Sequence, residues 1–254
     1  MTEPKLVVQN ITHSFRHRGQ SLTVLKDVNL NLYPDEFACI VGPSGCGKST
    51  LLNIIAGLVK PTSGNILIDG EVAPGPGPDR GMVFQSYTLY PWLTVAENIA
   101  FGLKLKQIPK VERQARVAYY LDIIGLTRFA NVYPKQLSGG MKQRVAIARA
   151  LANEPEVLLM DEPFGALDSQ TKEQLQEFFH DLWEKTHITV LSITHDVEEA
   201  VFLSQRIYIM GHRPGTIRDQ LDVTLPPKRV LDIKLTPEFF ELKRKVILSL
   251  RNTV

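Results

Sequence analysis

A glycine-rich loop that directly follows a short apolar run is the feature that most restricts the fold of this chain. Residues 37–41 read FACIV and residues 42–50 read GPSGCGKST. A short, continuous apolar run is typical of a strand buried on both faces, and the TLLNIIAGL stretch that comes next is typical of a helix. A strand, a loop and a helix in this order match the phosphate-binding pattern G-x-x-x-x-G-K-[ST] in full.

Each residue type in the loop has a use in holding phosphate. Glycines let the loop curl so that successive backbone N–H groups point inward, and a helix that starts near Lys48 adds the positive end of its dipole. We expect Lys48 to reach the β- and γ-phosphates of a nucleotide and the Ser49 hydroxyl to hold Mg²⁺. The predicted nucleotide-binding residues of the loop are Gly42, Pro43, Ser44, Gly45, Cys46, Gly47, Lys48, Ser49 and Thr50.

Polar residues end three other strand-like runs. The run EVLLMD ends at Asp161, which is expected to hold Mg²⁺ through water, and the neighbouring Glu162 is expected to polarise the attacking water. His195 follows the run ITVLSIT, where it can contact the γ-phosphate, and Gln85 ends the run GMVFQ, where it is placed to sense Mg²⁺ and water. The predicted catalytic residues are Glu162, His195 and Lys48, and the predicted Mg²⁺ ligands are Ser49, Gln85 and Asp161.

Strand-like and helix-like segments alternate along the chain. The segment DVNLNLY (27–33) alternates apolar and polar residues, as a half-buried antiparallel strand does. The segment LQEFFHDLW (175–183) has apolar residues at helical spacing, and Thr236 is the expected N-cap of a helix in the tail. The alternation predicts an α/β fold in which a β-rich arm precedes a mainly parallel sheet with covered faces.

The composition excludes several classes of protein. Hydrophobic residues make up 44% of the chain and charged residues 22%, and the net charge of +2 is too small to indicate nucleic acid binding. Cys39 and Cys46 lack metal-ligand spacing, so both are expected to be reduced thiols of a cytosolic protein. The N-terminal residues do not form a signal peptide, and no apolar run is long enough for a membrane span. Any membrane role is therefore expected from outside the bilayer.

The segment LSGGMKQR (137–144) resembles the signature segment of ATP-binding-cassette (ABC) ATPases. The order of the motifs is also similar to that family, from the glycine loop (Walker A) through Gln85 and the signature to the acidic strand end (Walker B), ALD (166–168) and His195. The resemblance implies a P-loop NTPase fold of ABC type, with ATP and Mg²⁺ as cofactors. It implies one domain over 1–254, a helical subdomain inserted at about 87–152, and a C-terminal tail at about 222–254.

The resemblance also implies a dimer. Two ABC subunits pack head to tail, each ATP lies between one Walker A loop and the partner's signature, and the partner is a second copy or a sister ATPase. Ser138, Gly139 and Gly140 would then bind the γ-phosphate held by the partner, at a helix N-terminus that suits an anion. An aromatic residue upstream stacks on adenine in this family, and Phe15 is the candidate. The alternative is that Phe15 packs within the β-rich arm.

Three segments resemble the ATPases of nitrate, sulfonate and taurine importers. They are residues 76–99, GHRPGTI (211–217) and the tail. This implies an importer subunit for a small, anionic solute, located at the cytoplasmic face of the membrane and working with a permease and a solute-binding protein, without nucleic acid. The permease would dock near Gln85–Trp92, in a groove formed by Tyr87, Leu89, Tyr90, Pro91 and Trp92. Trp92 could instead pack on the helical segment.

Two other functions stay open for an ABC ATPase. One is a non-transport role in DNA repair, chromosome structure or translation. The absence of heptads between Lys48 and Ser138, and a single cassette, argue against it. The other is a regulatory or lipid-transport role at the cell envelope, against which the proline-rich loop and the tail argue by resemblance.

Overall fold

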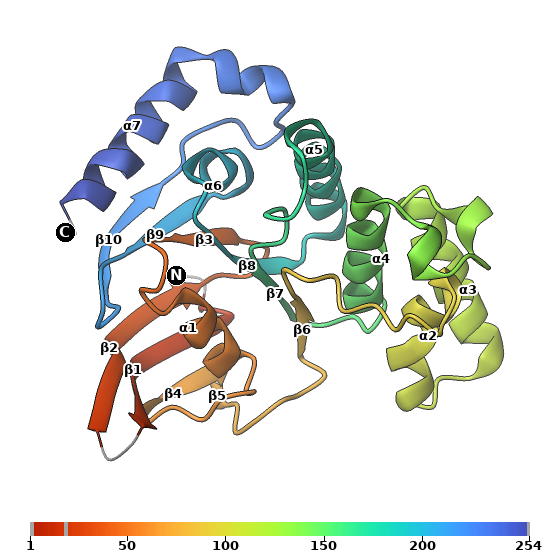
Figure 1. Cartoon of the computed structure of the whole chain (residues 1–254), viewed down its shortest axis with the longest axis horizontal. Helices are drawn as coiled ribbons and strands as arrows, with labels where there is room; N and C mark the ends of the chain where they lie inside the picture. Colours follow the sequence, from red (N-terminus) through yellow and green to blue (C-terminus); the bar gives the residue numbers. More distant parts are fainter. Residues whose placement is uncertain (1–2, 18–19, 253–254) are drawn as a thin grey trace.

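A six-stranded sheet lies at the centre of the molecule (Figure 1). The computed structural model describes residues 3–17 and 20–252, and in this part of the chain the strand order is β10-β9-β3-β8-β7-β6. Neighbouring strands are parallel except β10, which is antiparallel to β9. The strands are β3 (Phe37–Val41), β6 (Arg80–Val83), β7 (Val157–Asp161), β8 (Thr189–Thr194), β9 (Arg206–Met210) and β10 (Ile217–Asp222).

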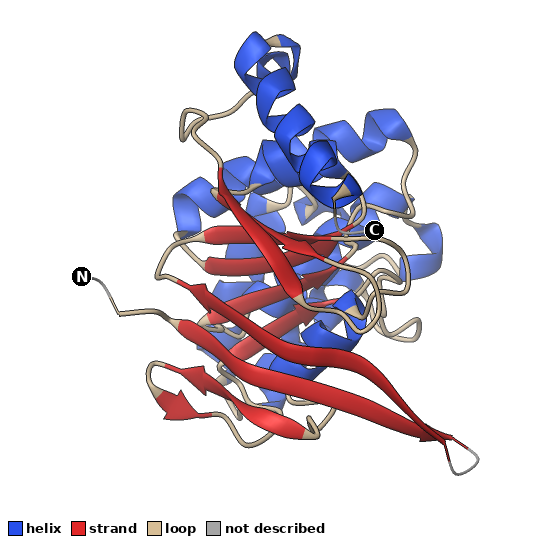
Figure 2. Cartoon of the chain, turned by 90° about the vertical axis from the view of Figure 1, so that its left-hand side faces the viewer, coloured by secondary structure: helices blue, strands red, loops and turns tan. Residues whose placement is uncertain are grey.

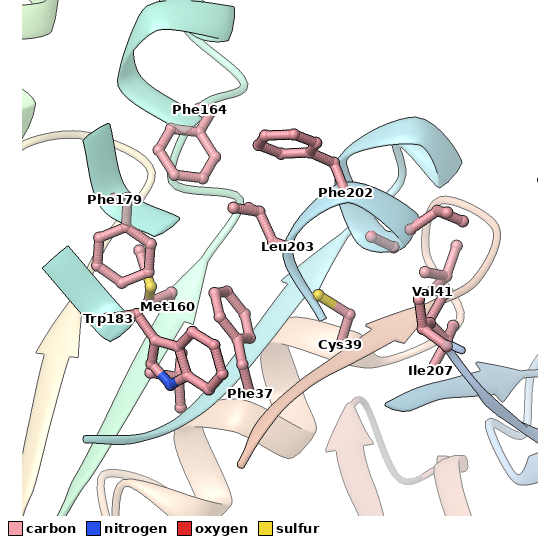
Figure 3. Close-up of a cluster of buried hydrophobic side chains, with 14 of the residues drawn as sticks. Phe37, Cys39, Val41, Met160, Phe164, Phe179, Trp183, Phe202, Leu203 and Ile207 are labelled. Carbon is pink, nitrogen blue, oxygen red and sulfur yellow. The ribbon is translucent and has the colours of Figure 1, made fainter. Parts of the chain in front are cut away.

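Strand β3 is buried on both faces, as its apolar run predicts. Because side chains alternate across a strand, Phe37, Cys39 and Val41 enter the hydrophobic cluster on one face of the sheet, while Ala38 and Ile40 enter the cluster on the other. Figure 3 shows Phe37 and Cys39 pointing into the first of these clusters. The strand that leads into the glycine loop therefore has a fixed position in the core.

The β-rich arm belongs to an antiparallel sheet with the strand order β2-β1-β4-β5. Its strands are β1 (Leu6–His17), β2 (Gln20–Leu32), β4 (Ser63–Ile68) and β5 (Glu71–Val72), and Figure 2 shows the two long strands running below the central sheet. Val28, Leu30 and Leu32 are buried and alternate with exposed neighbours, as predicted. They share one cluster with α1 (Lys48–Ile55) and with the central sheet.

Three helices cover the opposite face of the central sheet. They are α5 (Ser169–Thr186), α6 (Val197–Leu203) and α7 (Pro237–Arg251). Phe179, Phe202 and Phe239, one from each helix, are buried together in the cluster that contains Phe37. The predicted apolar face of α5 is confirmed, since Leu175, Phe179, Leu182 and Trp183 are buried.

A group of helices projects to one side of the sheet (Figure 1) and has its own hydrophobic cluster. Its members are α2 (Val95–Leu105), α3 (Lys110–Ile123), η1 (Thr127–Phe129), η2 (Pro134–Gln136) and α4 (Gly139–Leu151). Thr94 and Glu97 form a capping box that starts α2, and Pro109 precedes the first residue of α3. These helices fall inside 87–152, and the limits of an inserted subdomain stay a prediction.

Strand β6 is shorter than the apolar run GMVFQ indicates. It ends at Val83, so Phe84 and Gln85 lie beyond the sheet. In the described part of the chain, β6 lies at the edge of the sheet with β7 as its one neighbouring strand, and its last pair, Val83 with Met160, sets where it ends. Gln85 therefore sits on a loop, where its side chain can reach beyond the strand end.

A fully buried arginine attaches the tail to the sheet domain. Arg229 precedes η3 (Leu231–Leu235), and its Nη1 donates to the carbonyl oxygens of Val201, Phe202 and Ser204 at 3.2, 2.9 and 2.8 Å. These carbonyls end helix α6, so a cation is well placed there. Burial lowers the pKa of Arg229 to about 10.

The tail ends in helix α7. Thr236 caps this helix by accepting a hydrogen bond from the Phe239 N–H, and Pro237 is its first residue, as predicted. None of the helices in the described part of the chain is both long enough and apolar enough to cross a bilayer.

Candidate functional site

Three neighbouring strands bring the predicted site residues to one edge of the central sheet. Strands β3 and β8 end opposite each other at Val41 and Thr194, and β7 ends beside them at Asp161. The glycine loop, Glu162 and His195 follow these strand ends directly. Carboxyl ends of parallel strands form the usual binding edge of such sheets, so residues far apart in the sequence meet here.

The glycine loop is held in a conformation that suits an anion. Gly47 caps helix α1 with φ 108°, and a Cβ atom at this position would lie 2.8 Å from Leu25, so the turn requires glycine. The buried Nζ of Lys48 donates to the carbonyl oxygens of Gly42 and Pro43, at 2.7 and 3.0 Å. A curled loop, a helix N-terminus and a lysine at one place fit a polyphosphate.

Ser49 and Asp161 form a pair of oxygen ligands beside the loop. The Ser49 Oγ donates to Oδ1 of Asp161 at 3.1 Å. Burial raises the pKa of Asp161, the Ser49 hydroxyl and the Lys48 charge oppose this rise, and the charge of Glu162 adds to it. A hydroxyl and a carboxylate are the hard oxygen ligands that Mg²⁺ prefers, so the residues present fit this ion.

Glu162, His195 and Gln85 meet next to this pair. Nδ1 of His195 lies 3.0 Å from Oε2 of Glu162, and Nε2 of Gln85 lies 3.5 Å from the same oxygen. The backbone of Glu162 is held at φ 43°, with its N–H donating to the Ile193 carbonyl of β8 at 3.0 Å. The His195 side chain is 60% exposed, so it can reach a ligand as well as Glu162.

One open cavity of about 290 Å³ joins the glycine loop to the arm. Phe15 lies on its wall with 47% of its surface exposed, and its ring meets the His13 ring edge to face at 4.6 Å. A flat ring in the cavity could therefore lie against Phe15. The lining residues are Phe15, Leu22, Val24, Ser44, Gly45, Gly47, Lys48, Ser49, Thr50, Glu162 and Arg213.

The family model described as ABC transporter matches residues 25–165, from the second strand of the arm to the turn after Glu162. The chain belongs to the ABC transporter family. It is 52% identical to the nitrate import ATP-binding protein NrtD of Synechocystis over 97% of this chain and 95% of that protein. It is 44% identical to the taurine import ATP-binding protein TauB of Pelagibacter ubique over 97% and 95% of the two chains.

A solved structure of an ABC cassette has the same fold. The dimeric structure of a post-hydrolysis state of the ATP-binding cassette MJ0796, bound to ADP and Pi, matches with a TM-score of 0.76 and 38% identity. The match covers 87% of this chain and 100% of that chain. The predicted fold class, the predicted ABC-type ATPase and its nitrate/sulfonate/taurine importer group are confirmed by these similarities.

The ABC signature residues do not join the cavity of their own chain. Ser138 is exposed at the start of α4 and caps it by accepting a hydrogen bond from the Met141 N–H at 3.3 Å. None of Ser138, Gly139 and Gly140 is among the residues that line the 290 Å³ cavity. A Cβ atom at Gly139 would lie 2.9 Å from the Tyr87 hydroxyl. The signature therefore presents a capped helix N-terminus that does not line the cavity of the Walker A loop.

The segment 87–92, where the permease is predicted to dock, is held in place by the side chains of Asn98 and Arg149. Asn98, fully buried, accepts from the Tyr90 N–H at 2.9 Å and donates to the Tyr90 carbonyl at 3.2 Å. Arg149 donates to the Thr88 carbonyl at 2.8 Å and lies over the Tyr90 ring. The Trp92 side chain, in contrast, is 70% exposed, so packing on the helices does not account for it.

Three residues on the cavity wall, Leu22, Val24 and Arg213, are not among the predicted site residues, and Arg213 is the charged one of the three. Arg213 lines the cavity together with Lys48 and Phe15. It belongs to the GHRPGTI segment, which the sequence links to importer ATPases without indicating a role. The sequence offered one signal for a role of Arg213, which is that its segment follows a strand-like run. It did not indicate that this strand, β9, lies next to β3, because that depends on the order of the strands in the sheet.

Proposed function

We propose that this chain binds and hydrolyses ATP as the ATPase subunit of an importer for a small anionic solute. The observation that carries the proposal is the convergence of three separate motifs of the family on one sheet edge. Lys48 and Ser49 come from the Walker A loop, Asp161 and Glu162 from the Walker B strand end, and His195 follows strand β8. The names of the relatives, nitrate import and taurine import ATP-binding proteins, favour import over a non-transport or envelope role.

The Walker A loop is the proposed phosphate site. Its backbone N–H groups and the α1 N-terminus would face the phosphates, with Lys48 leaving its loop carbonyls to pair with phosphate oxygens. Phe15 would lie against adenine. Ser49, Asp161 and Gln85 would hold Mg²⁺, with Asp161 acting through water, and the ion would neutralise phosphate charge during the transfer.

Glu162 and His195 are the proposed catalytic pair. A carboxylate that is bonded to an imidazole has a fixed orientation, and this lets Glu162 accept a proton from an attacking water. His195 is exposed enough to donate toward a γ-phosphate oxygen. Gln85 can couple nucleotide binding beside Glu162 to the conformation of the segment 87–92. Its side chain contacts Glu162, and its backbone continues into that segment.

A head-to-tail dimer would complete the site. The signature N-terminus of α4 is exposed and does not line the cavity of its own chain, and the related MJ0796 cassette was solved as a dimer. We infer that Ser138, Gly139 and Gly140 bind the γ-phosphate held by a second copy or by a sister ATPase. The whole chain would act as one cassette, with the helices of 87–152 as its inserted subdomain.

The permease is proposed to dock over the segment 87–92. A cavity of about 370 Å³ opens beside Tyr90, Phe101 and Arg149, and exposed Trp92 stacks against Tyr90 at 5.7 Å. Exposed aromatic residues next to a hollow are typical of interface anchors. Docking there would put the protein at the cytoplasmic face of the membrane, and a solute-binding protein would act through the permease.

Co-purification from native membranes tests the proposal. The tagged Glu162→Gln chain is incubated with ATP and Mg²⁺, and bound proteins are identified by mass spectrometry. The expected partner is an integral membrane permease, and the Lys48→Ala chain serves as the control that should recover less of it. Recovery of ribosomal or DNA-bound proteins in place of a permease would contradict the transport role.

A further inference from the structure

The loop that joins β9 to β10 packs directly against the Walker A loop. It is closed by a hydrogen bond from the Gly211 N–H to the Thr216 carbonyl at 3.0 Å, and the Gly215 N–H donates to the Val24 carbonyl of β2 at 2.7 Å. A Cβ atom at Gly215 would overlap the carbonyl oxygen of Cys46. The loop 211–216 is thus closed on itself, bonded to β2 and packed against Cys46 of the Walker A loop.

Arg213 extends from this loop to the glycine loop. Its Nη2 donates to the carbonyl oxygen of Gly45 at 2.9 Å, and its side chain forms part of the cavity wall with Lys48 and Phe15. The bond holds the Gly45 carbonyl toward the guanidinium, while the N–H of the same peptide unit, on Cys46, donates to the Pro43 carbonyl at 3.4 Å. This peptide unit of the glycine loop is therefore tied at both of its polar ends.

Most of the Arg213 hydrogen-bonding capacity is unused. A guanidinium carries five N–H donors in a fixed plane, and Gly45 takes one of them. Within residues 3–17 and 20–252, no carboxylate pairs with Arg213, whereas Arg80, Arg116, Arg206 and Arg244 each have an acidic partner. Arg213 thus holds a positive charge and open donors at an anion-binding loop.

We propose that Arg213 is a further nucleotide-binding residue, which pairs with the polyphosphate of ATP or ADP while keeping its bond to Gly45. The inference rests on the proposed function of the cavity. A planar fork can direct one edge to a backbone carbonyl and another edge to phosphate, which a lysine ammonium cannot do with the same geometry. The segment 211–217 thereby adds a second cation to the site from outside the cassette motifs.

Equilibrium binding of ADP and of a non-hydrolysable ATP analogue, both with Mg²⁺, tests the inference. The variants are Arg213→Gln, Arg213→Lys and the matched control Arg218→Gln, which removes the same charge from the next exposed arginine of the chain. Because a charged hydrogen bond contributes about 1.5–3 kcal/mol, Arg213→Gln should weaken binding about tenfold or more. Arg213→Lys should bind with intermediate affinity, and Arg218→Gln should bind like the wild type.

The salt dependence of binding and the stability of the free protein separate a direct role from a structural one. A lost phosphate contact lowers the sensitivity of the dissociation constant to salt, and the thermal midpoint of Arg213→Gln without nucleotide should equal that of the wild type. Wild-type affinity in Arg213→Gln, or an equal loss in Arg218→Gln, would overturn the inference. A lower midpoint without nucleotide, with unchanged salt sensitivity, would also overturn it, because it would indicate that Arg213 only supports the loop.

The same binding measurements distinguish a failure of this inference from a failure of the proposed function. If the wild-type chain and Lys48→Ala bind the analogue equally, the cavity is not an ATP site and the proposed function fails. If the wild type binds, Lys48→Ala does not, and Arg213→Gln binds like the wild type, only the role of Arg213 fails.

Discussion

The imidazole of His195 lies 3.0 Å from the carboxylate of Glu162, although the two residues are 33 positions apart in the chain. Each follows the end of a buried strand, and the two strands, β7 and β8, are neighbours in the sheet. The contact between His195 and Glu162 therefore follows from the order of the strands, and no long loop is needed to bring the two side chains together. It also joins the proposed general base to a group that can contact the transferred phosphate.

Replacing Glu162 by glutamine should stop hydrolysis while preserving binding. The amide keeps the size of the side chain and a hydrogen bond to His195 but cannot take a proton, so turnover should fall at least about 100-fold. The turnover number is measured under saturating ATP, and gel filtration with ATP should show a dimer. Turnover near that of the wild type would contradict the role of Glu162, and a monomer at all ATP concentrations would contradict the dimer for the isolated chain.

Replacing Lys48 by alanine should weaken ATP binding and abolish turnover. The side chain is buried and bonded to Gly42 and Pro43, and its loss takes the positive charge from the loop, so affinity should fall by about 10- to 100-fold. Titration calorimetry measures the affinity, and circular dichroism checks that the fold is kept. A folded variant with unchanged affinity would refute the phosphate site.

Acid should destabilise the free protein through His180. This side chain is fully buried against the rings of Trp183 and Phe202. Burial and, to a smaller extent, the charge of Arg229 lower its pKa to about 4, against the opposing effect of Asp181. The unfolded chain, with an ordinary histidine pKa near 6.5, therefore binds a proton that the folded chain rejects, and stability falls as the pH drops from about 6.5 toward 4.

The His180→Phe variant isolates this effect. It keeps an aromatic ring in the site and removes the titrating group, so its urea midpoint should fall less than that of the wild type between about pH 7 and pH 5. His187→Phe, on the exposed side of the molecule, is the matched control and should follow the wild type. If the wild type and His180→Phe lose the same stability on acidification, groups other than His180 cause the loss, and this prediction is wrong.

Replacing Trp92 by alanine should uncouple the ATPase from its permease. The exposed indole is the largest anchor of the proposed docking surface, and loss of such an anchor typically costs 2 kcal/mol or more, about 30-fold in affinity. Co-purification with the permease should fall, whereas ATP affinity should stay within about twofold. Phe240, on α7, is another exposed aromatic residue, with 56% of its surface exposed against 70% for Trp92. The control variant Phe240→Ala should retain the permease. Unchanged co-purification in Trp92→Ala would refute the docking surface.

The sequence by itself determined the elements and the motifs. Buried runs such as 37–41 and the alternating residues of β2 form the expected strands, and Ser138 and Thr236 cap the expected helices, because side-chain periodicity and capping are local properties. The same local patterns place the glycine loop and the acidic strand end. They place the end of β6 two residues too late, at Gln85, because the end of this strand depends on its pairing with β7.

Only the tertiary structure decided which of these residues meet. The order β9-β3-β8-β7 brings Ser49 to Asp161 and His195 to Glu162, and it lays the loop that carries Arg213 against the Walker A loop. It also shows that Ser138 is exposed without lining the cavity of its own chain, and that Trp92 is exposed. These relations depend on strand order and on packing between distant segments, and no local pattern in the chain encodes them.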